Sequence, residues 1–166
     1  MKKLFAISVA LLFVGTVSLA RASKEDEAKA YTKILKTSKD AKEKIMAVTE
    51  IGNLGMVRKS YAKEAIPYLI EACKDKEAKL RAAAAEALGK VDPPEDTGAI
   101  ELLSDMVKND KEMAVRLSAA RGLGAMGASA KSALPTLREI AKTEDKKSPL
   151  SRGAMQAVQA IQGGKK

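Results

Sequence analysis

The sequence predicts an all-α fold of about four stacked helical hairpins. A short apolar motif recurs along the chain at offsets of 35, 34 and 34 residues. Within each copy the apolar residues recur every three or four positions, which is the spacing of an amphipathic helix. Aromatic residues make up only 3% of the chain, and β-branched runs are short, so the usual signals of strands are missing.

Each repeat contains two helical segments. The first segments begin with similar motifs: Ala30–Ile34, Ala65–Leu69, Ala99–Leu103 and Ala133–Leu137. A lysine follows each motif, in the expected last helical turn: Lys39, Lys74, Lys108 and Lys142. The second segments close near a glycine, at Gly52, Gly89, Gly124 and, after one inserted residue, Gly163. For the first three glycines we expect a left-handed conformation that ends the helix.

Residues at the boundaries support these helices. Ser148-Pro149 supplies an N-cap followed by proline, and Asp92-Pro93-Pro94 ends the helix that closes near Val91. We expect eight helices, near residues 26–38, 39–54, 62–74, 76–91, 98–109, 111–126, 130–142 and 149–162. They form four repeats, about 24–54, 61–91, 97–126 and 129–162. Because one hairpin cannot bury its apolar faces alone, neighbouring repeats must supply the core.

Residues 1–22 have the pattern of a secretory signal peptide. Lys2 and Lys3 precede a mostly apolar stretch from Leu4 to Leu19, and Ala20-Arg21-Ala22 supplies small residues for cleavage. We expect cleavage after Ala22, or two residues earlier after Ala20, which leaves one repeat domain over residues 23–166. The alternative is a retained membrane anchor, because the apolar stretch is just long enough to span a bilayer. Lys2-Lys3 and the short apolar region are typical of bacterial signal peptides. We therefore expect a periplasmic or secreted bacterial protein, with no stable membrane insertion after cleavage.

Composition excludes several chemistries. The 166 residues include no His and one Cys, so an imidazole base, an intrachain disulfide and a His- or multi-Cys-ligated metal are all impossible. No cofactor is expected. The formal net charge is +9, or +6 without residues 1–22, and the basic residues are interleaved with acidic ones. Such a mixed pattern does not predict nucleic-acid binding.

The organisation resembles the HEAT-like repeats of bacterial proteins, the family that includes phycobilisome-lyase-type repeats. The resemblance covers about Lys24 to Gln162 and is most specific over residues 65–72 and 79–89. The first repeat is a weaker match, since it lacks proline in its first helix and has Lys44 where Arg81 and Arg116 stand. The resemblance implies a right-handed α-solenoid whose second helices line the concave side. It also implies binding rather than catalysis.

Two Asp–Arg pairs recur at one spacing. Asp75 precedes Arg81 by six residues, and Asp110 precedes Arg116 by six. One interpretation is a charged catalytic constellation. The other, which the family resemblance supports, is a structural ladder in which each Asp caps a turn and pairs with an Arg of a neighbouring repeat.

A polar stripe on the second helices is the candidate binding site. One row is expected to contain Thr49, Glu86, Arg121 and Gln159, with Lys79, Lys90 and Arg152 beside it. Arg121 and Arg152 are the best recognition residues, because guanidinium groups form bidentate contacts with carboxylates. The alternative is a solvated face without a partner.

Five methionines and Cys73 occupy apolar columns and are expected in the core. The methionines are Met46, Met106, Met113, Met126 and Met155.

Three functions are compatible with these patterns. We expect a non-catalytic, exported scaffold that binds a protein or peptide. The alternative is an accessory or lyase-like factor that acts on a bound cofactor. Nucleic-acid binding is a third function, which the predicted export and the mixed charge disfavour. The fold class does not decide among these functions.

Overall fold

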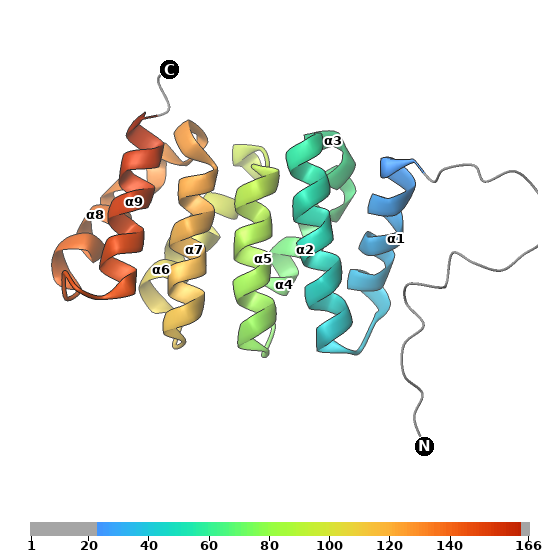
Figure 1. Ribbon diagram of the computed structural model, residues 1–166, viewed down its shortest axis with the longest axis horizontal. Helices are drawn as coiled ribbons and strands as arrows, with labels where there is room; N and C mark the ends of the chain where they lie inside the picture. The colour runs from blue at the N-terminus through green and yellow to red at the C-terminus, as the bar shows by residue number, and fades with distance from the viewer. Residues whose placement is uncertain (1–22, 164–166) are drawn as a thin grey trace, which may run out of the picture.

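The structure is a computed structural model that describes residues 23–163. The predicted signal peptide lies outside these residues and stays a prediction. Within them, helical hairpins stand side by side in a row (Figure 1). The α-helices are α1 (Lys24–Thr37), α2 (Ala41–Val57), α3 (Lys59–Ala62), α4 (Ile66–Ala72), α5 (Ala78–Val91), α6 (Ala99–Asn109), α7 (Met113–Ala125), α8 (Leu134–Thr143) and α9 (Pro149–Gly163). Three 3-10 segments join them: η1 (Lys63–Ala65), η2 (Glu95–Thr97) and η3 (Gly127–Ala133).

The helices form two layers. The second helices of the four hairpins, α2, α5, α7 and α9, make one continuous layer in which each packs against the next. The first helices, α1, α4, α6 and α8, pack against their own second helices and form the other layer (Figure 1). The described residues contain no strand. The predicted fold class, an all-α right-handed solenoid of four hairpins, is confirmed.

One hydrophobic core runs through all four hairpins. It extends from Leu35 in α1 to Ile161 in α9 without a break. Leucines at equivalent positions of successive repeats are fully buried, among them Leu69, Leu103 and Leu137 of the first helices. Many alanines are fully buried with them, among them Ala84, Ala85 and Ala119. Each hairpin therefore buries its apolar faces mainly against its neighbours, as a repeat architecture requires.

Two of the expected first helices are broken. Residues 62–74 contain the end of α3, η1 and α4, and residues 130–142 contain part of η3 followed by α8. In both repeats the regular helix starts one residue before a proline, at Ile66 for Pro67 and at Leu134 for Pro135. Proline is favoured in the first helical turn, where its missing N–H has no intrahelical partner to lose. The prolines therefore begin new helices.

The expected role of the glycine column is wrong. Gly52, Gly89 and Gly124 lie inside α2, α5 and α7, and none has a positive φ. Among residues 23–163, the left-handed residues are Asp92, Gly98 and Gly127, which lie in the connections between repeats. The glycine column instead marks the points where successive second helices touch.

These contacts leave no room for a side chain. A Cβ on Gly89 would lie 2.5 Å from both Cα and the carbonyl oxygen of Gly122, and a Cβ on Gly122 would overlap the carbonyl oxygen of Ala85. The flanking contacts are looser: a Cβ on Gly52 would lie 3.1 Å from Cα of Ala87, and one on Gly124 would lie 3.0 Å from Cα of Ala157. Backbone contact therefore sets the spacing of the second helices.

The expected core methionines divide into two groups. Met106 and Met126 are buried, whereas Met46, Met113 and Met155 are exposed, so for these three the prediction is wrong. The exposed ones stand on the solvent side of second helices, where an unbranched apolar side chain is tolerated singly. Cys73 is buried, and the burial raises the pKa of its thiol to about 12. A thiol in this state is a packing group rather than a nucleophile.

Candidate functional site

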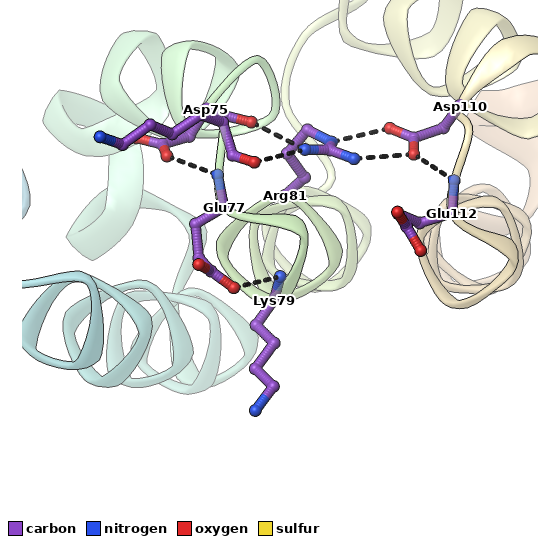
Figure 2. A network of polar contacts seen from close by, with 7 residues as sticks. Asp75, Glu77, Lys79, Arg81, Asp110 and Glu112 are labelled. Carbon is purple, nitrogen blue, oxygen red and sulfur yellow. Dashed lines mark hydrogen bonds and ion pairs between the residues drawn. The ribbon is translucent and has the colours of Figure 1, made fainter.

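Arg81 lies at the centre of a polar network that joins the second and third repeats (Figure 2). From the first turns of α5, its Nε donates to Oδ2 of Asp110 at 2.7 Å and its Nη2 donates to Oδ1 at 2.8 Å. Its Nη1 donates to the carbonyl oxygens of Asp75 and Lys76 at 2.9 and 3.2 Å. The guanidinium is thus held by a carboxylate of the next repeat and by the turn of its own repeat.

Burial and hydrogen bonding shape the charges of this pair. The side chains of Arg81 and Asp110 are 8% and 9% exposed. The hydrogen bond from Arg81 holds the pKa of Asp110 below its ordinary value of 3.8, and the backbone N–H of Glu112 adds to the effect. The same hydrogen bond raises the pKa of Arg81. Both groups therefore stay ionised over the ordinary pH range, which suits a structural bridge rather than proton transfer.

The other two interfaces carry related pairs. Lys44 of α2 approaches Asp75 at 3.8 Å, and Nη2 of Arg116 in α7 donates to Oε1 of Glu144 at 2.7 Å. Nε of Arg116 also donates to the carbonyl oxygen of Val107. In each pair a basic residue of one second helix meets an acid in the turn of the next repeat.

This arrangement shows what the sequence prediction missed. Asp75 and Asp110 each accept a hydrogen bond from the backbone N–H two residues later, which caps their turns. Asp75, however, faces a lysine rather than an arginine, and Arg116 pairs with Glu144, which the prediction did not include. Glu144 is not an Asp, and the residue six positions after it is Leu150 rather than an Arg, so a search for Asp–Arg pairs at one spacing does not find it. Aligning the turns of the repeats would have found it.

The exposed side of the second helices forms a separate polar surface, which we call the second-helix face. Oε1 of Glu86, in α5, accepts a hydrogen bond from Oγ of Ser118 at 2.9 Å and lies 3.9 Å from Nη1 of Arg121. Ser118 and Arg121 belong to α7. One helix earlier, Nζ of Lys90 donates to Oδ1 of Asn53 in α2 at 3.0 Å. Polar contacts thus cross from α2 to α5 and from α5 to α7, on the side where Arg121 is 61% exposed.

The fourth repeat does not continue the expected row. Gly124 of α7 packs on Ala157, as Gly89 packs on Gly122, so Gln159 occupies the glycine column. The residue equivalent to Arg121 is therefore Gln156. Arg152 lies near the start of α9, and Lys79 near the start of α5, so both are exposed at one end of the second-helix face. The structure brings Glu86 and Arg121 together and places the other three predicted residues apart from them.

A pocket of about 360 Å³ lies at the connections between repeats. Its apolar wall includes Ile66, Val91 and two prolines, and Lys59 and Lys63 line its rim. Asp92 also lines it, in a left-handed conformation that a non-glycine residue rarely adopts. The Asp92 carboxylate is paired with Lys59 and accepts a hydrogen bond from Ser129. One carboxylate thus joins α3, the loop after α5, and η3, and this fixes the shape of the pocket.

Within residues 23–163, no three His, Cys, Asp or Glu side chains are grouped to hold a metal ion. No helix in that range combines the length and the apolar character needed to cross a bilayer.

Known folds and families provide an independent comparison. Three solved structures have similar folds. One engineered protein from the Northeast Structural Genomics Consortium is 19% identical with a TM-score of 0.66, over 81% of this chain and 62% of its own. The complex of CpcE and CpcF of phycocyanin lyase from Nostoc sp. PCC7120 is 22% identical with a TM-score of 0.59, over 82% of this chain and 79% of the other. A second engineered protein is 20% identical with a TM-score of 0.63, over 81% of this chain and 37% of its own.

The chain thus spans less than two thirds of each engineered protein, and at these identities the likeness concerns the fold alone. No curated protein matches the sequence. Two family models do match: HEAT repeats over residues 28–112, and the PBS lyase HEAT-like repeat over residues 115–143. The first covers more than half of the sequence, and together the matches begin in α1 and end in α8. The chain therefore belongs to the HEAT-repeat family.

Proposed function

We propose that the protein is a non-catalytic helical-repeat scaffold that binds a protein partner through its second-helix face. The observation that carries the proposal is a polar cluster that bridges two helices on this face, in which the exposed Arg121 and the partly exposed Glu86 lie beside the buried hydroxyl of Ser118. Such a cluster presents an acceptor and a guanidinium donor at fixed positions. Arginine is among the residues that most often dominate binding energy at protein interfaces.

The packing below the face supports this proposal. The second helices touch backbone to backbone at the glycine column, so exposed side chains on neighbouring helices keep a fixed spacing. A surface that is already ordered loses little conformational entropy when a partner binds. The Arg81–Asp110 pair lies at the turn end of the same helices and secures their relative position. The network is therefore assigned a structural role, and the second-helix face the binding role.

The similar solenoid from Nostoc adds a second line of support. Its structure is a complex of two proteins, CpcE and CpcF. A solenoid of this kind can thus use its surface to bind another protein. For the present chain, the partner proposed is likewise a protein.

The proposed address is the exported compartment, on the evidence of residues 1–22 alone. Intact mass of the exported protein should correspond to a chain that begins at Ser23. A mass that still includes the apolar stretch from Leu4 to Leu19 would show a retained anchor instead.

Affinity capture from a periplasmic extract, with identification by mass spectrometry, tests the binding proposal. The test variant is Arg121→Glu with Arg152→Glu on the second-helix face. The matched control is Arg138→Glu with Lys142→Glu, which makes the same change in charge on the exposed side of α8. We expect the test variant to lose the partner and the control to retain it, with equal circular dichroism and melting. Equal capture by both variants would move recognition away from the second-helix face.

The alternative is an accessory or lyase-like factor that acts on a bound cofactor. Two observations support this alternative function: the PBS lyase HEAT-like match over residues 115–143, and the pocket beside Asp92. The apolar wall of this pocket and the ammonium groups of Lys59 and Lys63 suit a flat apolar molecule with carboxylate groups. Titration with a bilin, followed by absorbance, tests this alternative. A spectral change that Ile66→Glu removes would favour it over the scaffold.

A further inference from the structure

The turns within the hairpins gather positive charge along one edge of the molecule. We define the turn edge as residues 36–44, 73–81, 108–116 and 142–152, the four segments that join first to second helices. The turn edge contains fifteen Lys and Arg against eight Asp and Glu. The rest of residues 23–163 contains ten Lys and Arg against thirteen Asp and Glu. The excess of positive charge in residues 23–163 therefore lies on the turn edge, and the rest of these residues is close to neutral.

The hydrogen-bond network explains why this edge shows its cations. Asp75, Asp110 and Glu144 turn inward to pair with the second helices, and their side chains are at most 26% exposed. The arginines of the network, Arg81 and Arg116, are turned inward with them. Twelve other basic residues of the edge are exposed: Lys36, Lys39, Lys42, Lys74, Lys76, Lys79, Lys108, Lys111, Lys142, Lys146, Lys147 and Arg152. The exposed acids of the edge are three: Asp40, Glu112 and Asp145.

Two of the lysines in the repeated column differ from their expected position. Lys39 and Lys74 lie just beyond the ends of α1 and α4, whereas Lys108 and Lys142 lie in the last turns of α6 and α8. Figure 1 shows that all four turns lie along the same edge, the lower one in that view. Packed helices are about 8–10 Å apart. The exposed ammonium groups therefore form a band that extends over the whole row of hairpins.

We infer that the turn edge binds an anionic lipid surface and holds the solenoid edge-on. A planar surface of negative headgroups meets every turn of the band at once, whatever the spacing of the lysines. Eleven of the twelve exposed cations are lysines, whose ammonium groups act as point charges and suit diffuse headgroup charge better than bidentate recognition of a peptide. The turn edge contains no aromatic residue to insert or to stack on bases.

The remaining charge favours a single orientation. The rest of residues 23–163 has no excess of exposed cations, so the molecule orients with its turns toward the headgroups. In this orientation most of the second-helix face lies away from the lipid surface and is accessible to a partner, including Arg121 of α7. This adsorption involves no insertion and is independent of the protein partner proposed above.

Vesicle co-sedimentation tests the inference. The probes are phosphatidylcholine vesicles with and without about 30% phosphatidylglycerol, in about 0.1 M and about 0.5 M NaCl. The test variant is Lys76→Glu, Lys111→Glu and Lys146→Glu, all exposed on the turn edge. The control is Lys33→Glu, Lys63→Glu and Lys131→Glu, which changes the net charge equally at exposed positions elsewhere. Duplex DNA and polyglutamate are tested in parallel.

We expect binding to the phosphatidylglycerol vesicles alone, in low salt alone. The test variant should lower the vesicle partition coefficient by at least about 100-fold. Each lysine near an anionic surface raises this coefficient by roughly tenfold or less, and a glutamate in its place is also repelled by the headgroups. The control should bind within a few-fold of the unmodified protein. Equal losses in both variants would overturn the inference, as would equal binding to phosphatidylcholine alone. Edge-dependent binding to DNA or polyglutamate without vesicle binding would assign the edge to a soluble polyanion instead.

Discussion

The interface between the second and third repeats differs from the interface between the first and second, although both join the same kind of hairpin. At the former, the backbones of α5 and α7 touch at Gly89 and Gly122, and a buried bidentate pair closes the turn end. At the latter, a Cβ on Gly52 would lie 3.1 Å from Cα of Ala87, which is a tight contact but a looser one than at Gly89. The ion pair there, Lys44–Asp75, is 3.8 Å long and about a quarter exposed.

The interfaces between successive repeats therefore differ in strength, although the hairpins on either side have the same fold. The stability of a solenoid is approximately a sum of terms for single repeats and for neighbouring pairs. A buried, bidentate pair and a longer, partly solvated ion pair contribute differently to such a sum. The central interface should therefore hold the row together, while the first repeat opens more readily. The following predictions test that ranking.

Removing the guanidinium should have the largest effect. Arg81→Ala leaves the carboxylate of Asp110 buried without its main partner, and we expect the free energy of unfolding to fall by about 3 kcal/mol. Lys44→Ala, the matched change at the first interface, should cost less than about 1 kcal/mol because its pair is partly solvated. Chemical denaturation followed by circular dichroism measures both. Equal losses would show that the two interfaces do not differ.

Adding one methyl group at the glycine contact should have the next largest effect. Gly122→Ala forces α5 and α7 apart against backbone atoms, and we expect a loss of about 1–3 kcal/mol. Gly52→Ala meets only a tight contact and should cost less. Gly163→Ala serves as the control, since the added carbon would meet no other helix of residues 23–163 within 4 Å. A harmless Gly122→Ala would contradict close backbone packing at the central interface.

Acid should weaken the central interface in a defined direction. The pKa of Asp110 is lower in the folded protein than its ordinary value of 3.8, so the unfolded chain binds a proton more readily. The contribution of Asp110 to the free energy of unfolding is complete above pH 3.8, and it is lost as the pH falls from 3.8 through the lower pKa of the folded protein. We expect the unmodified protein to lose more stability in this interval than Asp110→Asn does. Denaturation curves at several pH values below 5 would measure the difference, and parallel curves would refute it.

The smallest change should sharpen the comparison by strengthening the weak interface. Lys44→Arg gives the first repeat the residue type found at its equivalents, Arg81 and Arg116. A guanidinium can reach Asp75 with two hydrogen bonds, and we expect a gain of about 0.5 kcal/mol in the free energy of unfolding. Hydrogen exchange of α1 and α2 would report the gain locally. Faster exchange in the variant would show that the geometry of the first turn does not admit the pair.

Sequence periodicity predicted the four helical hairpins, because burying an apolar stripe every 3.6 residues leaves few alternatives. The motifs of residues 65–72 and 79–89 carried the resemblance to the family. The sequence also placed Arg81 and Asp110 in a repeated polar pattern. Only the tertiary structure decided what each polar or small residue contacts. The glycines fit a helix-ending pattern equally well, and packing alone revealed their role at the helix contacts. Likewise, Glu144 became a partner of Arg116, and the lysines of four distant turns formed one edge, because these contacts join residues about thirty positions apart that no local pattern relates.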